Sequence, residues 1–419
     1  MHLMKTGVFL VFVLFVAGCT SRPGISRQSA GGSRDVPPTV LLISLDGFRH
    51  DYLEKVPTPH LNRLAREGVR ARWLTPVFPS MTFPNHYSIV TGLYAEHHGI
   101  VNNSMYDPQF KADFSLGKRA EVSNGRWWSG EPLWVTAEKQ GQKAATFYWP
   151  GSEAEIAGRR PSYWKEFDNK VPDAARVDTV LAWLSLPVAR RPSFLTLYLS
   201  QVDHEGHEHG PDSPEVLRAV QAADSTLGRL VAGLERRKLY DRVNVIVVSD
   251  HGMAPTSPQR VTYLDDFVDM NDVERVDWGV VTGIWPKSGR EEAVYRSLQA
   301  EHHPHMQVYR KSEIPARYHY RQHRRIAPIV CVAADAWYIS SRAYMEKNKD
   351  KFNRGNHGYD NQTANMRAIF VARGPAFKPG YTAEPFGNVH LYSLMAHILN
   401  LTPAPNDGSL DSVRAVLRN

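Results

Sequence analysis

The sequence lacks long hydrophobic runs and internal repeats. Its first apolar run extends from Val8 to Ala17 and is too short to cross a bilayer as a helix. Lys5 precedes this run, which is typical of an export signal rather than of a membrane anchor. The chain has 419 residues, of which 42% are hydrophobic and 22% charged, and this is enough for one large α/β domain with insertions.

Cysteine is also scarce, with only Cys19 and Cys331 in the chain. The segment Val16–Cys19 is similar to a bacterial lipobox, whose cysteine becomes a lipidated N-terminus, although Val replaces the usual Leu. We therefore predict a lipoprotein-type signal peptide over residues 1–19 and a flexible Ser-, Gly-, Arg- and Pro-rich tether over residues 20–37. Cys331 would then be the only thiol, which excludes an intramolecular disulfide, and its apolar surroundings predict inert packing.

These features predict a protein that is exported, either periplasmic or anchored in the outer membrane. Thr20, and not Asp, follows the cysteine, which favours outer-membrane sorting if the cell is Gram-negative. Contact with the membrane is expected only through the N-terminal lipid. The net charge of +7 comes from scattered basic residues, which favours attraction of an anionic substrate, or solubility, over specific binding of nucleic acid.

Acidic residues follow three apolar runs that are typical of buried parallel strands. The runs and the residues that follow them are 39–45 before Asp46, 194–199 before Asp203, and 243–249 before Asp250 and His251. Open α/β sheets place their sites at the carboxyl ends of strands, so we expect these side chains to lie close together.

Seven residues along the chain offer three carboxylates, three imidazoles and one hydroxyl, which can hold two zinc ions and supply a nucleophile. They are Asp46, Thr82, Asp203, His207, Asp250, His251 and His357. One ion is expected on Asp203, His207 and His357, with a vacant position for substrate or water. The other is expected on Asp46, Asp250 and His251, with Thr82 as its fourth ligand. Four positive charges against three carboxylates suit an anionic substrate such as a phosphate ester.

Each of these residues also has a structural explanation. An Asp-Gly pair after a strand is usually a turn, and Thr82 could cap a helix whose first turn contains Pro84. The polar segment 203–209 is by default a solvated loop, in which His204 and His209 are structural or exposed. The joint occurrence of all seven favours the metal site.

The chain resembles the nucleotide pyrophosphatase/phosphodiesterases of the alkaline phosphatase superfamily from about residue 38 to 407, and it looks like a bacterial member. The matching blocks occur in the family's order and are 79–94, 98–107, 149–152, 203–207, 249–253 and 357–361. The resemblance implies an alkaline phosphatase-like α/β fold, with a central, largely parallel sheet flanked by helices. We expect the catalytic domain to span residues 38–419, with a small inserted α/β subdomain at about 280–350.

The resemblance also implies roles for single residues. Thr82 would be the nucleophile that forms a covalent phospho-threonine ester, and Asn103 would donate to a phosphate oxygen, although an Asn in a polar loop is otherwise a turn residue. Phe83 and Phe167 would form an aromatic slot for a base, with Phe167 at a position where the family commonly has Tyr. The alternative is that both are ordinary core residues.

The function that this predicts is zinc-dependent hydrolysis of nucleotide diesters or pyrophosphates, with release of nucleoside 5'-monophosphates. Diesterase activity on lipid or choline phosphodiesters, and phosphomonoesterase activity, remain alternatives on the same two ions. No Arg stands next to Thr82 to neutralise a second phosphate charge, which disfavours the monoesterase. A non-catalytic binding lipoprotein is disfavoured because every required position is filled. Manganese in place of zinc stays open, as does the oligomeric state.

Overall fold

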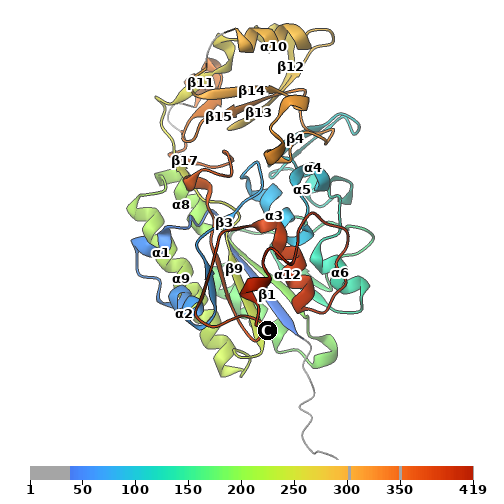
Figure 1. Cartoon of the computed structure of the whole chain (residues 1–419), viewed down its shortest axis with the longest axis vertical. Helices are drawn as coiled ribbons and strands as arrows, with labels where there is room; N and C mark the ends of the chain where they lie inside the picture. The colour runs from blue at the N-terminus through green and yellow to red at the C-terminus, as the bar shows by residue number, and fades with distance from the viewer. Residues whose placement is uncertain (1–37, 301–302, 349–351, 419) are drawn as a thin grey trace, which may run out of the picture. The chain divides into compact units, whose positions relative to one another are not determined.

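A computed structural model describes residues 38–300, 303–348 and 352–418. The predicted signal peptide and tether lie outside these residues. The described chain is built on an eight-stranded sheet in the order β19-β2-β18-β9-β1-β8-β6-β7 (Figure 1). Its strands are β1 (Thr39–Leu45), β2 (Val69–Ala71), β6 (Ala144–Phe147), β7 (Tyr163–Lys165), β8 (Phe194–Leu199), β9 (Val243–Val248), β18 (Phe370–Arg373) and β19 (Tyr381–Ala383).

The sheet is largely parallel, which confirms the predicted fold class. β1 pairs in parallel with β8 on one side and β9 on the other, while β18 pairs antiparallel with both β9 and β2. All seven residues of β1 are buried, as expected for the central strand of a sheet that is covered on both faces.

Helices cover the two faces of this sheet. Alternate residues of β1 belong to different apolar clusters, with Val40 and Leu42 in one and Leu41 and Ile43 in the other. The first cluster contains side chains of α3 (Thr82–Thr91), α6 (Leu133–Lys139) and α12 (Leu391–Ile398). The second contains side chains of α2 (Pro59–Glu67), α7 (Asp173–Leu184) and α9 (Pro214–Arg236).

A smaller antiparallel sheet, in the order β12-β13-β15-β14, has its own apolar cluster beside the main sheet (Figure 1). Its elements are β12 (Val273–Asp277), β13 (Val281–Pro286), α10 (Glu291–Gln299), β14 (Met306–Arg310) and β15 (Ile329–Ala333). The sheet begins at Val273, a few residues before the boundary expected at about 280. Cys331 lies on β15 with no exposed surface, and burial raises the pKa of its thiol to about 12, which agrees with inert packing.

Two local expectations differ from the structure. The segment expected as a polar loop is the helix α8 (Gln201–His209), and it places Asp203 and His207 one turn apart on the same face. Thr82 is the first residue of α3 and not its cap, since Met81 occupies the capping position with extended backbone. Among the described residues, no helix combines the length and apolar character needed to cross a membrane.

Candidate metal centre and substrate pocket

The seven predicted site residues converge at the carboxyl ends of three neighbouring strands. Asp46 directly follows β1, Asp250 and His251 follow β9, and α8 begins two residues after β8. Gly47 makes the turn after Asp46 with a φ of +66°, and a side chain at this position would meet the backbone of Asp203 at 2.9 Å. The Asp-Gly pair is therefore both a turn and part of the site.

The group predicted around Asp46 is assembled. Nε2 of His251 lies 3.6 Å from Oδ1 of Asp46 and 3.0 Å from Oδ2 of Asp250. Oγ1 of Thr82 lies 3.3 Å from the same nitrogen. The four donor atoms therefore surround one small space, as the sequence predicted.

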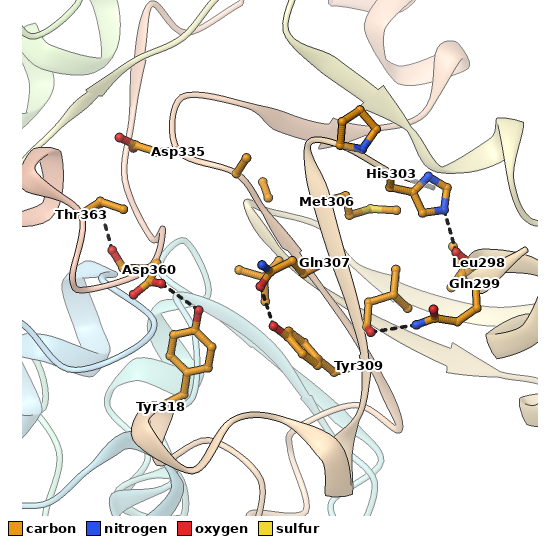
Figure 2. Close-up of a pocket in the computed structure, with 15 residues that line it drawn as sticks. Leu298, Gln299, His303, Met306, Gln307, Tyr309, Tyr318, Asp335, Asp360 and Thr363 are labelled. Carbon is orange, nitrogen blue, oxygen red and sulfur yellow. Dashed lines mark hydrogen bonds between the residues drawn. The ribbon is translucent and has the colours of Figure 1, made fainter. Parts of the chain in front are cut away.

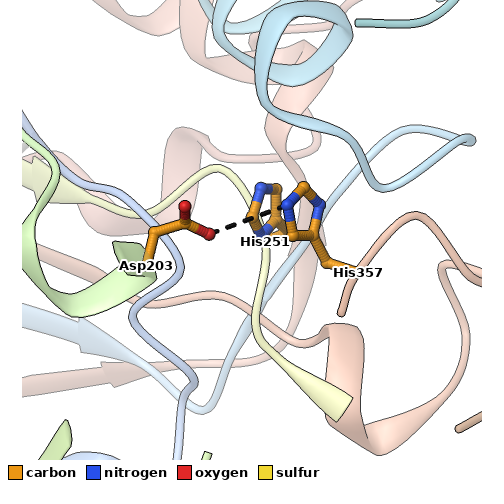
Figure 3. Close-up of side chains that lie close together, drawn as sticks. All are labelled: Asp203, His251 and His357. Carbon is orange, nitrogen blue, oxygen red and sulfur yellow. Dashed lines mark ion pairs between the residues drawn. The ribbon is translucent and has the colours of Figure 1, made fainter. Parts of the chain in front are cut away.

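The group predicted around Asp203 is assembled as well. Oδ1 of Asp203 lies 3.5 Å from Nε2 of His207 and 3.6 Å from Nε2 of His357. The two Nε2 atoms lie 3.1 Å apart. The rings of His251 and His357 stack at 3.6 Å between centroids, so that the two groups are adjacent (Figure 3). Donor atoms of Asp203, His251 and His357 also lie within 4.8 Å of one another.

The three histidines are held in one tautomer by backbone carbonyls. The Nδ1 atom of each lies at hydrogen-bond distance from a carbonyl oxygen: His207 from Gly355 at 2.9 Å, His251 from Gly252 at 2.8 Å, and His357 from Ser80 at 3.0 Å. A carbonyl only accepts, so each Nδ1 carries a proton, and in the neutral ring each Nε2 presents a lone pair. When both rings are neutral, the Nε2 lone pairs of His207 and His357 face each other at 3.1 Å, and a cation between them would remove the repulsion.

Each of the three carboxylates has an oxygen atom without a hydrogen-bond donor. Oδ2 of Asp46 accepts from the Tyr198 hydroxyl at 2.5 Å, and Oδ1 of Asp250 accepts from the Gly47 amide at 3.2 Å. Their other oxygens, together with Oδ1 of Asp203, are buried and accept no hydrogen bond in the described chain. Buried carboxylate oxygens of this kind are normally paired or bound to metal.

The donor spacing fits zinc. Bonds of about 2.0 to 2.1 Å in tetrahedral geometry put neighbouring ligand atoms about 3.3 Å apart. The three distances between donors of the Asp203 group and the three distances from Nε2 of His251 in the Asp46 group run from 3.0 to 3.6 Å. The residues therefore fit two zinc ions, one in each group.

Burial gives the ligands unusual proton affinities. Burial and the charges of Asp250 and Asp203 raise the pKa of Asp46 well above its ordinary value. Burial and the neighbouring His251 and His207 hold the pKa of His357 well below its ordinary value, so this ring stays neutral and able to bind a cation.

Asn103 contacts the residue next to Thr82. Its Oδ1 accepts from the backbone amide of Phe83 at 2.8 Å, which fixes the side-chain amide. Nδ2 has no hydrogen-bond partner among the described residues, and the side chain is held at the start of α3, where Thr82 lies.

A cavity of about 180 Å³ leads away from Thr82 and is lined by both predicted aromatic residues, Phe83 and Phe167. Phe83 packs on the core cluster, 5.9 Å between centroids from Trp128. Phe167 is 39% exposed and lies 5.2 Å from Tyr148. Among the described aromatic pairs the two rings do not contact each other, and both face the same cavity.

Figure 2 shows a second, larger cavity of about 850 Å³. It lies along β14 and is bounded by Asp335, Asp360 and Thr363. None of the predicted site residues lines it. The smaller cavity is therefore the one that belongs to the metal centre.

Sequence reasoning missed two residues that support the site. Tyr198 on β8 holds Asp46 through its hydroxyl, and the fully buried His86 lies with Nδ1 2.8 Å from the Thr82 carbonyl and Nε2 2.8 Å from the Ser44 hydroxyl. The available signal for Tyr198 was a hydroxyl-bearing side chain near the carboxyl end of a largely apolar strand. His86 stands one helical turn after Thr82, which was its only signal.

Comparison with known proteins identifies the family of this chain. The family described as type I phosphodiesterase/nucleotide pyrophosphatase matches residues 40–360. Human ectonucleotide pyrophosphatase/phosphodiesterase family member 1 is 42% identical over 407 residues, covering 94% of this chain and 43% of the relative. Rat family member 3 is 39% identical over 398 residues, covering 92% and 44%. The chain thus spans less than half the length of these two relatives.

Human family member 5 is 39% identical over 381 residues, covering 91% of this chain and 78% of the relative. Among solved structures, an inactive threonine-to-alanine variant of murine family member 5 in complex with AMP has a TM-score of 0.86 at 40% identity, covering 91% of this chain and all of that chain. These relatives are mammalian, so the expected bacterial origin finds no support in them. The chain belongs to the type I phosphodiesterase/nucleotide pyrophosphatase family, within the alkaline phosphatase superfamily.

Proposed function

We propose that this chain is a zinc-dependent enzyme that hydrolyses nucleotide phosphodiester or pyrophosphate bonds and releases nucleoside 5'-monophosphates. The observation that carries this proposal is the position of Thr82. Its hydroxyl lies 3.3 Å from Nε2 of His251, beside carboxylate and imidazole groups that could hold metal ions, and it lines the pocket that also contains Phe83 and Phe167. The AMP complex of the murine relative supports a nucleotide as the ligand.

The two zinc ions would be held by Asp203, His207 and His357 and by Asp46, Asp250, His251 and Thr82. When bound, they supply positive charge next to the phosphate and lower the pKa of the Thr82 hydroxyl. This assignment agrees with the spacing of the donor atoms and with the carbonyl-fixed histidines. Tyr198 and the Gly47 amide orient the two carboxylates.

The reaction then proceeds in two displacements. Oγ1 of Thr82 gives its proton to solvent and attacks phosphorus, while the bond from phosphorus to the leaving oxygen breaks and a nucleotidyl-threonine ester forms. Nδ2 of Asn103 donates to a phosphate oxygen on which charge develops. Water hydrolyses the ester, which restores Thr82 and releases the monophosphate. The aromatic rings of Phe83 and Phe167 hold the base, and stacking contributes about 1 to 3 kcal/mol.

Export is part of the proposal. We expect the mature protein to begin at a lipid-bearing Cys19 and to reach the membrane only through that lipid. The predicted signal and the names of the ectoenzyme relatives support export. Mass spectrometry of the mature N-terminus tests this: an acylated Cys19 supports the anchor, and an unmodified N-terminus upstream of Cys19 contradicts it.

The test of activity compares kcat/KM on bis-p-nitrophenyl phosphate and on p-nitrophenyl phosphate for the zinc-loaded protein. We expect the diester to be preferred, and Thr82→Ala to lower kcat/KM by a factor of about 1,000 or more. Thr91→Ala, at the other end of α3, is the matched control and should retain activity.

The other outcomes are equally informative. Preference for the monoester would make the protein a phosphomonoesterase on the same metal site. Full activity of Thr82→Ala would remove Thr82 as the nucleophile. If the diester is preferred, a panel of nucleotide and choline-lipid diesters separates the leading function from the lipid-directed alternative.

A further inference from the structure

An ion pair lies in the same cavity as the aromatic slot. Arg119 and Glu153 line the cavity that contains Thr82, Phe83 and Phe167. Arg119 is the first residue of α5 (Arg119–Val122), and Glu153 follows β6 by six residues. Neither residue belongs to the metal centre, and hydrolysis as described above uses neither of them.

Glu153 holds the arginine in place. Its Oε2 accepts from Nη2 of Arg119, and its Oε1 accepts from the backbone amide of Phe167 at 3.1 Å. Glu153 is only 8% exposed, so both oxygens are already committed inside the protein. The carboxylate thereby links the arginine to the backbone of Phe167, one of the two rings of the slot.

Arg119 keeps hydrogen-bond donors for a ligand. Its side chain is 38% exposed, and its Nε and Nη1 donate to no residue of the described chain. Its guanidinium carbon lies 5.9 Å from the centroid of the Phe167 ring. The free N–H groups thus lie next to the slot, where the edge of a stacked base would meet them.

Base edges differ in what they offer to such donors. Guanine presents two acceptors side by side, O6 and N7, which arginine binds with two hydrogen bonds. Adenine presents N7 beside an amino donor, which would face the guanidinium without a partner. Each Glu153 oxygen already accepts one hydrogen bond, and the side chain is only 9% exposed, which leaves little of it open to that amino group.

We propose that Arg119, positioned by Glu153, hydrogen-bonds to the base edge and makes the site selective for guanine nucleotides. This inference rests on the proposed nucleotide phosphodiesterase function and adds the base that the enzyme prefers. Arg119 is a specificity residue, and Glu153 acts through it.

The test measures kcat/KM of the zinc-loaded, full-length protein on the p-nitrophenyl esters of guanosine and adenosine 5'-monophosphate. We expect the guanine ester to be preferred by about five- to tenfold. Arg119→Met removes the donors and should bring the ratio of kcat/KM on the guanine ester to kcat/KM on the adenine ester close to one. Arg119→Gln should move it further towards adenine, because a side-chain amide matches N6 and N7 of adenine.

Arg126→Gln is the matched control. Arg126 also pairs with a glutamate, Glu121, and its side chain is also 38% exposed, but it does not line the cavity. The guanine-to-adenine ratio of kcat/KM in Arg126→Gln should equal that of the unmodified protein. The ratio is formed within each variant, so a general loss of activity does not enter it.

Equal rates on the two esters in the unmodified protein would overturn the proposal, as would a guanine preference that survives in Arg119→Met. Hydrolysis of bis-p-nitrophenyl phosphate, which has no base, keeps these failures separate from failure of the proposed function. A protein that hydrolyses this diester without base preference has the proposed function but not the proposed selectivity.

Discussion

At the scale of single residues, the site depends on backbone carbonyl groups as well as on side chains, and their positions cannot be read from the residue types. The sequence predicted seven ligand residues, and the structure brings all seven close together; their binding of metal stays a prediction. The proton positions on the histidines depend on the carbonyls of Ser80, Gly252 and Gly355, whose side chains are irrelevant to the contact. For this reason the residue types could be predicted, whereas the tautomers that make them ligands could not.

The position of His251 leads to a prediction about metal content. His251 contributes to donor clusters with both Asp46 and Asp203, whereas His207, among the predicted ligands, contacts Asp203 and His357. We expect His207→Ala to bind one zinc ion per chain and His251→Ala to lose most of both, as measured by elemental analysis after dialysis. His209→Ala, on the same helix with an ion pair to Glu205, should keep both ions. Full zinc content in His251→Ala would contradict the inference that His251 lies between the two groups and is needed by both ions.

Asn103 provides a second prediction at this scale. Removing the amide donor should lower kcat by about 100- to 1,000-fold, since preorganised donors contribute about 2.7 to 4 kcal/mol. Asn103→Asp keeps an acceptor for the Phe83 amide and lacks the donor, so it should lose as much kcat as Asn103→Ala. An active Asn103→Asp variant would show that the residue serves only to hold Phe83.

At the scale of elements, the strands were predictable and the ligand-bearing helix was not. Buried runs such as 39–45 identify strands because nearly all their residues are apolar, and these strands fix where Asp46 and Asp250 lie. The helix α8 has only two buried residues, Val202 and Gly206, so its sequence shows no apolar stripe. Contacts with the neighbouring helix α9 and with β17 (Gly355–Asn356), which is distant in sequence, favour the helix over the expected loop.

The hairpin of β12 and β13 contains a carboxyl group that should make stability depend on pH. Burial raises the pKa of Asp277 to about 6, although its Oδ2 accepts from Nε1 of Trp285 at 2.7 Å. Between about pH 4 and 6 the folded protein keeps a proton that the unfolded chain releases. The free energy of unfolding therefore falls as pH rises through this window, by roughly 2 to 3 kcal/mol.

Asp277→Asn removes this dependence while keeping an acceptor for Trp285. We expect the variant to be more stable than the unmodified protein at pH 7 and about equally stable at pH 4, as measured by urea unfolding at both values. Asp411→Asn, with a side chain that is 83% exposed, is the control and should change stability at neither pH. Equal stabilities of Asp277→Asn and the unmodified protein at pH 7 would show that the ionised carboxylate is tolerated.

At the scale of the whole molecule, the metal centre joins the main sheet to the smaller one. His357 belongs to the segment that follows the smaller sheet, and Gly358 packs against Val280 and Met81, the residue before Thr82. The sequence predicted an inserted subdomain but not this contact, because it depends on the relative placement of the two sheets.

Zinc should therefore stabilise the whole fold. A ligand present at a hundred times its Kd raises the free energy of unfolding by about 2.7 kcal/mol. We expect a chelator to lower the urea concentration at which half of the protein is unfolded, and added zinc to restore it. The same treatment of the His251→Ala variant should have a much smaller effect. An unchanged midpoint after complete removal of zinc would mean that the donor cluster is stable without cations.

The central claim is that Thr82 forms a covalent ester with the substrate phosphorus. The most direct measurement is the stereochemical course at phosphorus, with a chiral phosphorothioate diester hydrolysed in ¹⁸O-labelled water. Two successive in-line displacements predict overall retention of configuration, whether or not the ester accumulates. Inversion would show a single attack by water and would contradict the role given to Thr82.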